Sequence, residues 1–233
     1  MAVEIRELRG IAELKAAEDL QRSVWGPDDP PDGSDLLLVV QHEGGLVAGA
    51  FEAGRMLAFL FALPTATPGV QHSHRLAVLP EARGLKLGAR MKWFQRDWGL
   101  AHGVHLVRWT YDPLRAINAG LNIAGLGAQA RIYHRDYYGE MVGINAGLPS
   151  DRIVAEWWLD TRKVAAHADG KPLTATGRRV PIPRDLDGLM GKDPTAALQA
   201  RLQLRETLEQ AFAEGQAIIG FDRQTAEYLL GRP

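Results

Sequence analysis

The chain has 233 residues, of which 46% are hydrophobic and 24% are charged, and its formal net charge is −1. This composition is typical of a globular protein, and it supplies no overall positive field for nucleic acid or anionic membranes. The absence of Cys excludes disulfides, thiolate metal sites, iron–sulfur clusters and a Cys nucleophile. Any chemistry must therefore use His, carboxylates, Tyr, Ser, Thr, Asn or backbone groups.

The start of the chain does not resemble a signal peptide, because Glu4, Arg6, Glu7 and Arg9 interrupt it. No run approaches the ~20 apolar residues that cross a bilayer. We therefore expect a cytoplasmic protein that binds neither a membrane nor nucleic acid.

Hydrophobic periodicity predicts the elements of the first half of the chain. In order, these are a strand at 3–8, a helix at 11–24, a loop at 26–33, a strand at 35–42, strands at 46–52 and 55–63, a strand at 71–79 and a helix at 87–102. Ala53–Gly54 is expected to close a hairpin, and Gly103 to follow the end of the last helix.

The second half is predicted in the same way. A strand at 104–111 pairs in parallel with 71–79 through a right-handed crossover. Asp112 is expected to cap a helix that starts at Pro113 and fades at 125–127. Strands at 130–137 and 152–161, irregular chain at 167–184, a helix at 194–214 capped by Asp193 and a strand at 215–221 complete the prediction.

The texture of the chain changes after Lys163, which divides it into two parts. We expect a core at 1–163 and a C-terminal extension at 164–233 that is too small and loop-rich to stand alone. The extension is expected to pack on the core, cover the acceptor side or form a dimer interface.

The most informative segment runs from Leu76 to Arg90. A strand ends at Pro80, a basic loop with Gly84 follows, and an amphipathic helix opens directly afterwards with Gly88 in its first turn. Free N–H groups at a helix start, approached closely past glycine, form an anion site suited to a pyrophosphate. The alternative is a strand–helix turn whose glycines serve only backbone geometry.

This segment resembles the signature of the GCN5-related N-acetyltransferase (GNAT) superfamily. The signature is a Leu-x-Val-x-Pro-like strand end, then Arg/Gln-x-x-Gly-x-Gly/Ala and a helix; here it corresponds to Leu76-Ala77-Val78-Leu79-Pro80 and Arg83-Gly84-Leu85-Lys86-Leu87-Gly88. Lys86 departs from the pattern, which has glycine there. The order of predicted elements over about residues 3–163 also matches the superfamily.

The resemblance implies an α/β fold with a mixed, mostly antiparallel sheet and a central, splayed parallel strand pair flanked by helices. It implies acetyl-CoA or another acyl-CoA as co-substrate, with loop amides on the pyrophosphate and the preceding strand beside the pantetheine arm. The residues that it assigns to this contact are Leu76, Ala77, Val78, Arg83, Gly84, Leu85, Lys86, Leu87, Gly88 and Ala89.

A second segment, 109–123, contains Trp-Thr-Tyr-Asp-Pro-Leu followed by Asn118 and Asn122. The two Asn residues lie four apart on one helix face, which suggests buried hydrogen bonding that is either structural or directed at the coenzyme. This block, with Tyr137-Tyr138-Gly139, Asp151-Arg152 and Trp157/Trp158, is similar to a branch of predicted acyltransferases associated with N-acylamino-acid racemases. That branch implies succinyl transfer from succinyl-CoA to an amino acid.

Candidates for proton transfer are His72, His74, Tyr133 and Tyr138. His72 and His74 alternate on one strand and share a face, as do Ser73 and Arg75, and either His is a reasonable general base. The alternative for each is a hydrogen-bonded sheet residue; a metal pair is not expected, since no other ligands accompany it.

The superfamily usually places an acid Tyr in the helix before Gly127 and an aromatic residue after it. Here that helix has no Tyr, and Ala128 follows Gly127. Tyr133, Tyr137 or Tyr138 could replace the acid, or could simply be packing aromatics. Candidate carboxylate clamps, which could equally be structural, are Arg108, Arg115, Arg131, Arg135 and Arg152.

Together these features predict an acyl-CoA-dependent N-acyltransferase that acts by direct transfer on a small amine or amino acid, as a homodimer. The absence of aromatic and Tyr residues from their usual positions leaves a non-catalytic acyl-CoA-binding module as an alternative. A protein or peptide N-acetyltransferase is the other.

Overall fold

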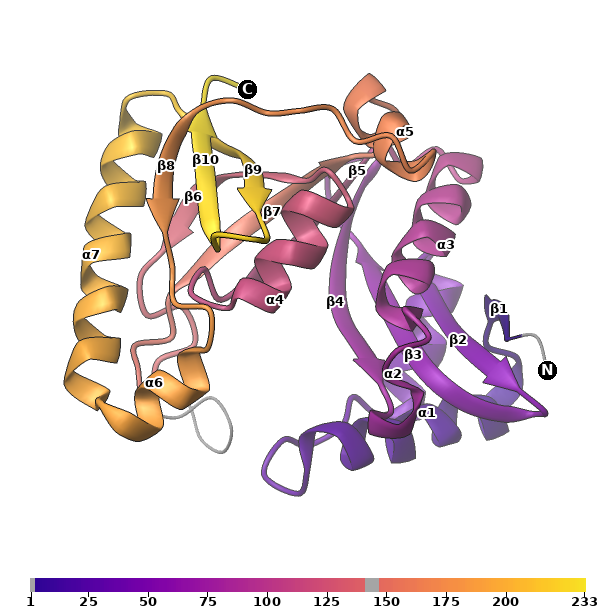
Figure 1. The fold of residues 1–233 in the computed structure, drawn as a ribbon. Coiled ribbons are helices and arrows are strands. Elements are labelled where there is room, and N and C mark those ends of the chain that lie inside the picture. Colours follow the sequence, from indigo (N-terminus) through magenta and orange to yellow (C-terminus); the bar gives the residue numbers. More distant parts are fainter. Residues whose placement is uncertain (1–2, 141–146) are drawn as a thin grey trace. The chain divides into compact units, whose positions relative to one another are not determined.

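A computed structural model of the chain describes residues 3–140 and 147–233, which form two compact α/β units (Figure 1). Unit 1 is Met1–Arg108 and unit 2 is Trp109–Pro233. Strand β5 (Leu106–Tyr111) begins in unit 1 and ends in unit 2.

Unit 1 carries strands in the order β1-β2-β3-β4-β5. Its elements are β1 (Glu4–Glu7), α1 (Gly10–Trp25), α2 (Ser34–His42), β2 (Leu46–Glu52), β3 (Arg55–Pro64), β4 (Val70–Val78), the 3-10 turn η1 (Pro80–Ala82), α3 (Leu87–Ala101) and the start of β5. Neighbours are antiparallel except for β4 and β5, which pair in parallel from Val70–Leu106 to His72–Arg108. The predicted parallel pair is therefore confirmed, while its splaying stays a prediction.

The core of unit 1 lies on both faces of β2 and β3, whose residues are almost all buried. Helix α3 lies against β2, β3 and β4, and α1 and α2 pack against the same sheet. Ala53 and Gly54 both have positive φ (50° and 80°) and join Glu52 to Arg55, as a two-residue hairpin turn requires. This confirms the predicted hairpin.

The strand predicted at 35–42 is wrong, because this segment is helix α2. Its buried residues are Ser34, Leu37 and Val40, three apart on one helix face. Leu36 and Val39 lie between them and are exposed at 45% and 55%. Because apolar residues also occupy the exposed face, the sequence shows a continuous apolar run, which is typical of a buried strand. The pattern of burial in the structure is helical.

Unit 2 carries strands in the order β7-β6-β9-β10-β8, all antiparallel where pairing is described. Its elements are α4 (Ala116–Ala119), the π-helical turn η2 (Gly120–Gly125), β6 (Gln129–His134), β7 (Arg152–Trp158), α5 (Arg162–Ala168), β8 (Arg178–Pro181), α6 (Leu186–Lys192), α7 (Pro194–Ala213), β9 (Ala217–Asp222) and β10 (Glu227–Gly231). Helix α7 packs against β6 and α6 (Figure 1).

The C-terminal part is more regular than predicted. The structure has four elements that the sequence analysis did not predict. β8 lies in the segment expected to be irregular, α5 runs into it, and no element was expected at α6 or β10. Asp193 does cap α7, because its side chain accepts from Ala196 N at 2.9 Å. β9 pairs with β6 through Ala130 and Ile218, so residues from both sides of position 163 build unit 2.

Candidate functional site

The segment that connects β4 to α3 leaves an array of backbone donors open. In the described part of the chain, the N–H groups of Gly84, Lys86, Leu87, Gly88 and Ala89 donate to no other backbone group. They cluster at the start of a 15-residue helix, where the helix dipole is positive. These are the donors that the predicted anion site requires; anion binding at this loop stays a prediction.

Backbone geometry at two positions shapes this loop. Gly84 has a φ of +95°, which L side chains rarely adopt, and open space surrounds the position of a Cβ there. Lys86 is the N-cap residue of α3 and adopts the left-handed conformation (φ 54°, ψ 29°). That conformation is the one for which glycine is normally used, so Lys86 keeps the loop geometry and adds an ammonium.

The electrostatics of the loop favour an anion. The first turn of α3 holds no acidic residue. Arg83 and Lys86 precede it, both exposed. A pyrophosphate placed here would meet backbone donors, a positive helix end and cationic side chains together.

Strand β4 has a one-residue bulge that alters which side chains share a face. Arg75 pairs with Phe61 and Ser73 pairs with the next residue of β3, Ala62, so His74 has no partner in β3. Since Phe61 and Ala62 face opposite sides, Ser73 and Arg75 do too. The prediction that Ser73 and Arg75 share a face is therefore wrong.

The two histidines do share a face, as predicted. Their ring centroids lie 6.0 Å apart, and the His74 ring meets the edge of Phe61. His74 is exposed and His72 is half-buried. Burial, with smaller contributions from the charges of His74 and Lys92, lowers the pKa of His72 below its ordinary value of 6.5. His72 is therefore unprotonated at neutral pH, as a general base must be.

Behind β4, on the Ser73 face, lies a buried polar layer that sequence reasoning missed. Lys92 of α3 donates from Nζ to Ser73 Oγ at 2.8 Å and to Gln95 Oε1 at 3.1 Å. Lys92 is 3% exposed, and burial lowers its pKa to about 7. The apolar pattern that predicts helix α3 does not include Lys92 or Gln95. Their role in the interior is apparent only from their burial in the structure.

On the opposite face, Arg75 ties β4 to the connection between α1 and α2. Its guanidinium forms ion pairs with Asp32 at 2.8 Å and Asp29 at 2.9 Å, and Cζ lies 4.7 Å from the ring centroid of Trp25. The predicted loop at 26–33 is thus fixed beside the face that carries His72 and His74.

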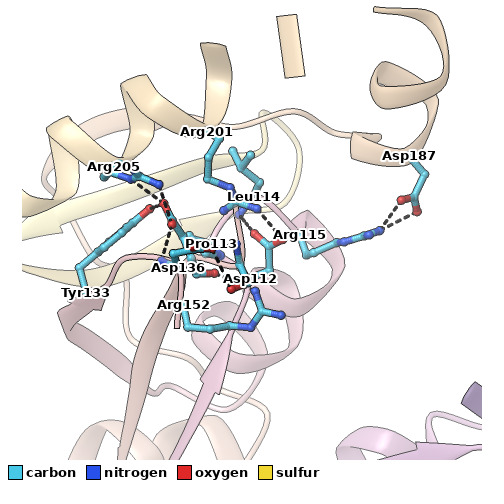
Figure 2. Close-up of polar contacts among 12 residues, drawn as sticks. Asp112, Pro113, Leu114, Arg115, Tyr133, Asp136, Arg152, Asp187, Arg201 and Arg205 are labelled. Atoms are coloured by element: carbon cyan, nitrogen blue, oxygen red, sulfur yellow. Dashed lines mark hydrogen bonds and ion pairs between the residues drawn. The ribbon is translucent and has the colours of Figure 1, made fainter. Parts of the chain in front are cut away.

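In unit 2, the helix after β5 starts later than predicted. Asp112 does not cap a helix at Pro113; its Oδ1 accepts from Leu114 N at 2.8 Å, and the helix begins at Ala116. Oδ2 of Asp112 binds Arg201 Nη2 at 2.7 Å (Figure 2). This contact joins the end of β5 to α7, 89 residues further along the chain.

The two candidate amides lie in this region. Asn118 is half-buried in α4, and Asn122 is 5% exposed in η2. η2 is a π-helical turn, in which Leu126 N donates to Leu121 O, five residues earlier. Turns of this kind are frequent at functional sites.

Tyr133 lies beside Arg205 (Figure 2), and both bind the buried carboxylate of Asp151. Its hydroxyl donates to Asp151 Oδ2 at 2.6 Å, and Arg205 binds the same carboxylate through two bonds of 2.8 Å. Burial alone would raise the pKa of Asp151, but hydrogen bonds from Arg205 and Tyr133 hold it below its ordinary value. Burial and Asp151 raise the pKa of Tyr133, so this hydroxyl holds its proton firmly.

The hydroxyl of Tyr138 lies in a different environment from that of Tyr133. It is 51% exposed, its Oη lies 3.1 Å from Thr110 Oγ1, and Arg152 stacks on its ring with Cζ 5.1 Å from the centroid. Tyr137 packs edge-on against Tyr138. Of the candidate acids, Tyr138 has the more accessible hydroxyl.

Most of the arginines considered as carboxylate clamps have protein partners. The ion pairs are Arg115 with Asp187, Arg131 with Glu156 and Arg135 with Glu209. These contacts favour the structural interpretation for the three residues.

No group of three or more metal-ligating side chains is placed to hold a metal ion in residues 3–140 and 147–233. Among the same residues, no helix combines the length and apolar character needed to cross a membrane.

Comparison with solved structures identifies the fold. The ribosomal-protein-S18-alanine N-acetyltransferase from Escherichia coli is 20% identical with a TM-score of 0.54, over 69% of this chain and 96% of that one. A putative GNAT-family acetyltransferase from Desulfovibrio desulfuricans is 20% identical (TM-score 0.53; 68% and 99% covered). A putative acetyltransferase from Salmonella typhimurium, solved with acetyl-CoA, is 19% identical (TM-score 0.55; 70% and 96% covered).

At these identities the likeness shows the fold alone, and this chain has the GNAT fold. No protein-family model matches the sequence, and no curated protein does.

Proposed function

We propose that the protein is an acyl-CoA-dependent N-acyltransferase that acts on a small amine or amino acid. One observation carries the proposal: within a GNAT fold, five backbone N–H groups between Gly84 and Ala89 lie open at the start of α3. They form a preorganised anion site in the segment where the superfamily signature expects the coenzyme pyrophosphate.

The residues of unit 1 fit an acyl-CoA. The open amides and the side chains of Arg83 and Lys86 would hold the pyrophosphate, and Leu76, Ala77 and Val78 of β4 would lie along the pantetheine arm. When bound, acyl-CoA supplies a thioester whose carbonyl is open to attack by an amine. Backbone N–H groups of β4 would polarise that carbonyl.

His72 is the proposed base, because it is unprotonated at neutral pH and half-buried on the face fixed by Arg75. It would take the proton from the acceptor ammonium, with exposed His74 or a water as the substitute. A tyrosine hydroxyl would return a proton to the departing thiolate; Tyr138 suits this better than Tyr133, whose hydroxyl is bound to Asp151. Asn118 and Asn122 remain candidate coenzyme contacts.

The acyl group and acceptor are proposed from the branch resemblance: a succinyl group transferred to an amino acid. Acetyl-CoA is the second donor to test, because the structural neighbours named above are acetyltransferases. A cytoplasmic location and a homodimeric state complete the proposal.

The reaction is tested by incubating the protein with succinyl-CoA or acetyl-CoA and a panel of D- and L-amino acids and simple amines. Product is read by mass spectrometry and thiol release by a colorimetric reagent. Acylated amino acid is the expected result. Tight CoA binding without turnover on any acceptor, including a peptide panel, would instead support the non-catalytic module; turnover on peptides alone would support protein acetylation.

The coenzyme site is tested separately, by binding. Gly84→Ala places a Cβ on a residue with φ +95° and should displace the loop amides, weakening CoA binding at least 10-fold by calorimetry. Gly54→Ala is the matched control, since Gly54 also has positive φ (+80°) and open surroundings but lies in the β2–β3 turn. Equal CoA affinity in the two variants would refute the pyrophosphate assignment.

A further inference from the structure

Unit 2 contains a pocket of about 320 Å3 that the proposed transfer reaction does not use. Its walls come from η2, α5, the connection at 172–175 and strands β8, β9 and β10. All of these belong to unit 2, so the pocket is complete within it. A volume of this size is at the lower end of the range for ligand sites.

One wall of the pocket is apolar. Ile123 of η2 and Phe221 of β9 are buried, and Leu229 of β10 and Leu173 of the connection join them. Such a surface favours the apolar body of a small organic molecule rather than a fully hydrated ion.

A single ammonium group provides the charge. Lys163 of α5 lines the pocket, is half-buried and donates from Nζ to Ile219 O at 2.9 Å. An ammonium has three N–H donors, so two remain for another acceptor. In the described residues, no carboxylate forms an ion pair with Lys163.

The other charged groups near Lys163 do not neutralise it. Asp222 also lines the pocket, but Arg179 binds it at 3.2 Å. His167, one turn along α5, has Nδ1 3.1 Å from Gly125 O, and Arg223 donates to Gly120 O. Arg179 also binds Glu227 at 2.6 Å, so these two carboxylates are balanced by Arg179 and Arg223 together, and Lys163 remains the uncompensated charge.

We propose that this pocket binds a small carboxylic acid, with its carboxylate on Lys163 Nζ and its apolar body on Ile123 and Leu229. A single ammonium beside an apolar wall matches one negative charge on a body of a few carbons. It does not match a nucleotide or a polyphosphate, which would require several donors. The site is independent of the transfer reaction.

Binding should be coupled to proton uptake. Burial lowers the pKa of Lys163 to about 8, so part of the population is uncharged above that pH. A bound carboxylate favours the ammonium and raises this pKa, hence binding at pH 8.5 takes up a proton and binding at pH 6.5 takes up little at Lys163. His167 would add uptake at the lower pH, since its pKa is lowered by burial and by Lys163 and Arg223.

The test is a titration of the full-length protein with phenylacetate, isovalerate and hexanoate, using calorimetry in two buffers of different ionisation enthalpy. The matched neutral ligand is phenylacetamide. We expect saturable binding of at least one carboxylate, binding of phenylacetamide at least 10-fold weaker, and proton uptake at pH 8.5. No saturable binding of any of the three acids would overturn the proposal.

Two variants and one control variant locate the binding. Lys163→Met should weaken carboxylate binding at least 10-fold, whereas Arg162→Met, which changes the exposed neighbour on α5, should leave it unchanged. Ala124→Leu, which fills the pocket from η2, should abolish binding while Lys163 is retained. Equal weakening by the Lys163 and Arg162 variants, or full binding to the filled pocket, would show attraction by general surface charge and refute the site.

A wild-type measurement covers the case in which Lys163→Met does not fold. Reductive methylation at pH 8 should modify the Lys163 amine readily, and mass spectrometry of the digest reports it. Phenylacetate should protect Lys163 at least 5-fold and phenylacetamide should not. Modification of Lys163 at the same rate with and without saturating phenylacetate would contradict the proposal.

Discussion

Lys86 shows how one residue can combine a backbone and an electrostatic role. It occupies the left-handed conformation at the start of α3, which costs a non-glycine residue about 1 kcal/mol, and in return it places an ammonium beside the open amides. The sequence exposes the departure from the glycine pattern. Only the structure shows that the loop conformation survives it.

We predict that Lys86→Gly raises the free energy of unfolding by up to about 1 kcal/mol, because the strain is relieved. It should also weaken CoA binding several-fold and reduce its dependence on salt, because the ammonium is lost. Lys86→Asn, which tolerates the same conformation without charge, should weaken binding equally. Urea denaturation and calorimetry at two salt concentrations measure both effects.

Lys15→Gln, an exposed neutralisation on α1, is the control and should change neither quantity. CoA affinity that is unaltered in both Lys86 variants would mean that the ammonium does not reach the ligand.

His72 carries the prediction on pH. Because its pKa is lowered, its base form persists at slightly acidic pH, and protonation as pH falls below 6.5 should remove acyl transfer. His72→Gln should reduce kcat about 100-fold or more, whereas His74→Gln, at the exposed ring, should have a small effect on kcat. His74→Gln should also raise the pKa of His72, since the His74 charge contributes to lowering it.

The pKa is measured by NMR titration of the histidine rings, in wild type and in His74→Gln. A His72 pKa at or above 6.5 in the wild type would contradict this assignment, as would a pH–rate profile that His72→Gln leaves unchanged.

At the scale of elements, local pattern predicts most strands and the three longest helices, and it fails where the deciding contact is distant in sequence. The β2–β3 hairpin and the Asp193 cap follow from adjacent residues. Asp112-Pro113 has the same local appearance as a helix start, but one oxygen of Asp112 binds Arg201 of α7, and no local rule includes that partner. α2 was misread because apolar residues occupy its exposed face as well as its buried one.

The candidate site shows the same division. The anion loop follows from glycine spacing and the helix pattern that surrounds it. Other features depend on strand register and on packing between elements far apart in sequence. These are the bulge at His74, the buried contacts of Lys92 and the ion pairs of Arg75. An alternating pattern assumes a strand without a bulge. It therefore could not predict that Ser73 and Arg75 lie on opposite faces of β4.

The ion pair between Arg205 of α7 and Asp151, the residue before β7, yields a stability prediction. Arg205→Met removes the bidentate partner of Asp151, which is fully buried, and should lower the free energy of unfolding by about 3 kcal/mol at pH 7. In the wild type, this contribution is present above the ordinary Asp pKa of 3.8 and is lost as pH falls through the lowered folded value. The deficit of the variant should therefore narrow below pH 4.

Arg135→Met is the matched control. It breaks an exposed ion pair with Glu209, which lies on α7 like Arg205, and it should leave the free energy of unfolding unchanged. Chemical denaturation at pH 7 and pH 3.5 measures both variants. An equal loss in the two would show that burial of Asp151 is not the cause.

At the scale of the whole molecule, the residues after 163 cannot be a detachable appendage. β9 is the partner of β6, and Arg201 and Arg205 of α7 neutralise Asp112 and Asp151. The composition changes at Lys163, whereas the two compact units meet at 108/109. Residues 164–233, which the sequence analysis treats as an extension, are therefore part of unit 2.

We therefore predict that a chain truncated after Lys163 loses unit 2. Truncation uncovers the edge of β6 and removes the arginine partners of Asp112 and Asp151, and the latter is fully buried. The truncated chain should be insoluble or should lack cooperative unfolding, whereas the full chain should unfold cooperatively by calorimetry. A soluble 1–163 fragment that melts cooperatively and binds CoA would instead establish that the extension is dispensable, and would place the boundary of the folding unit at 163.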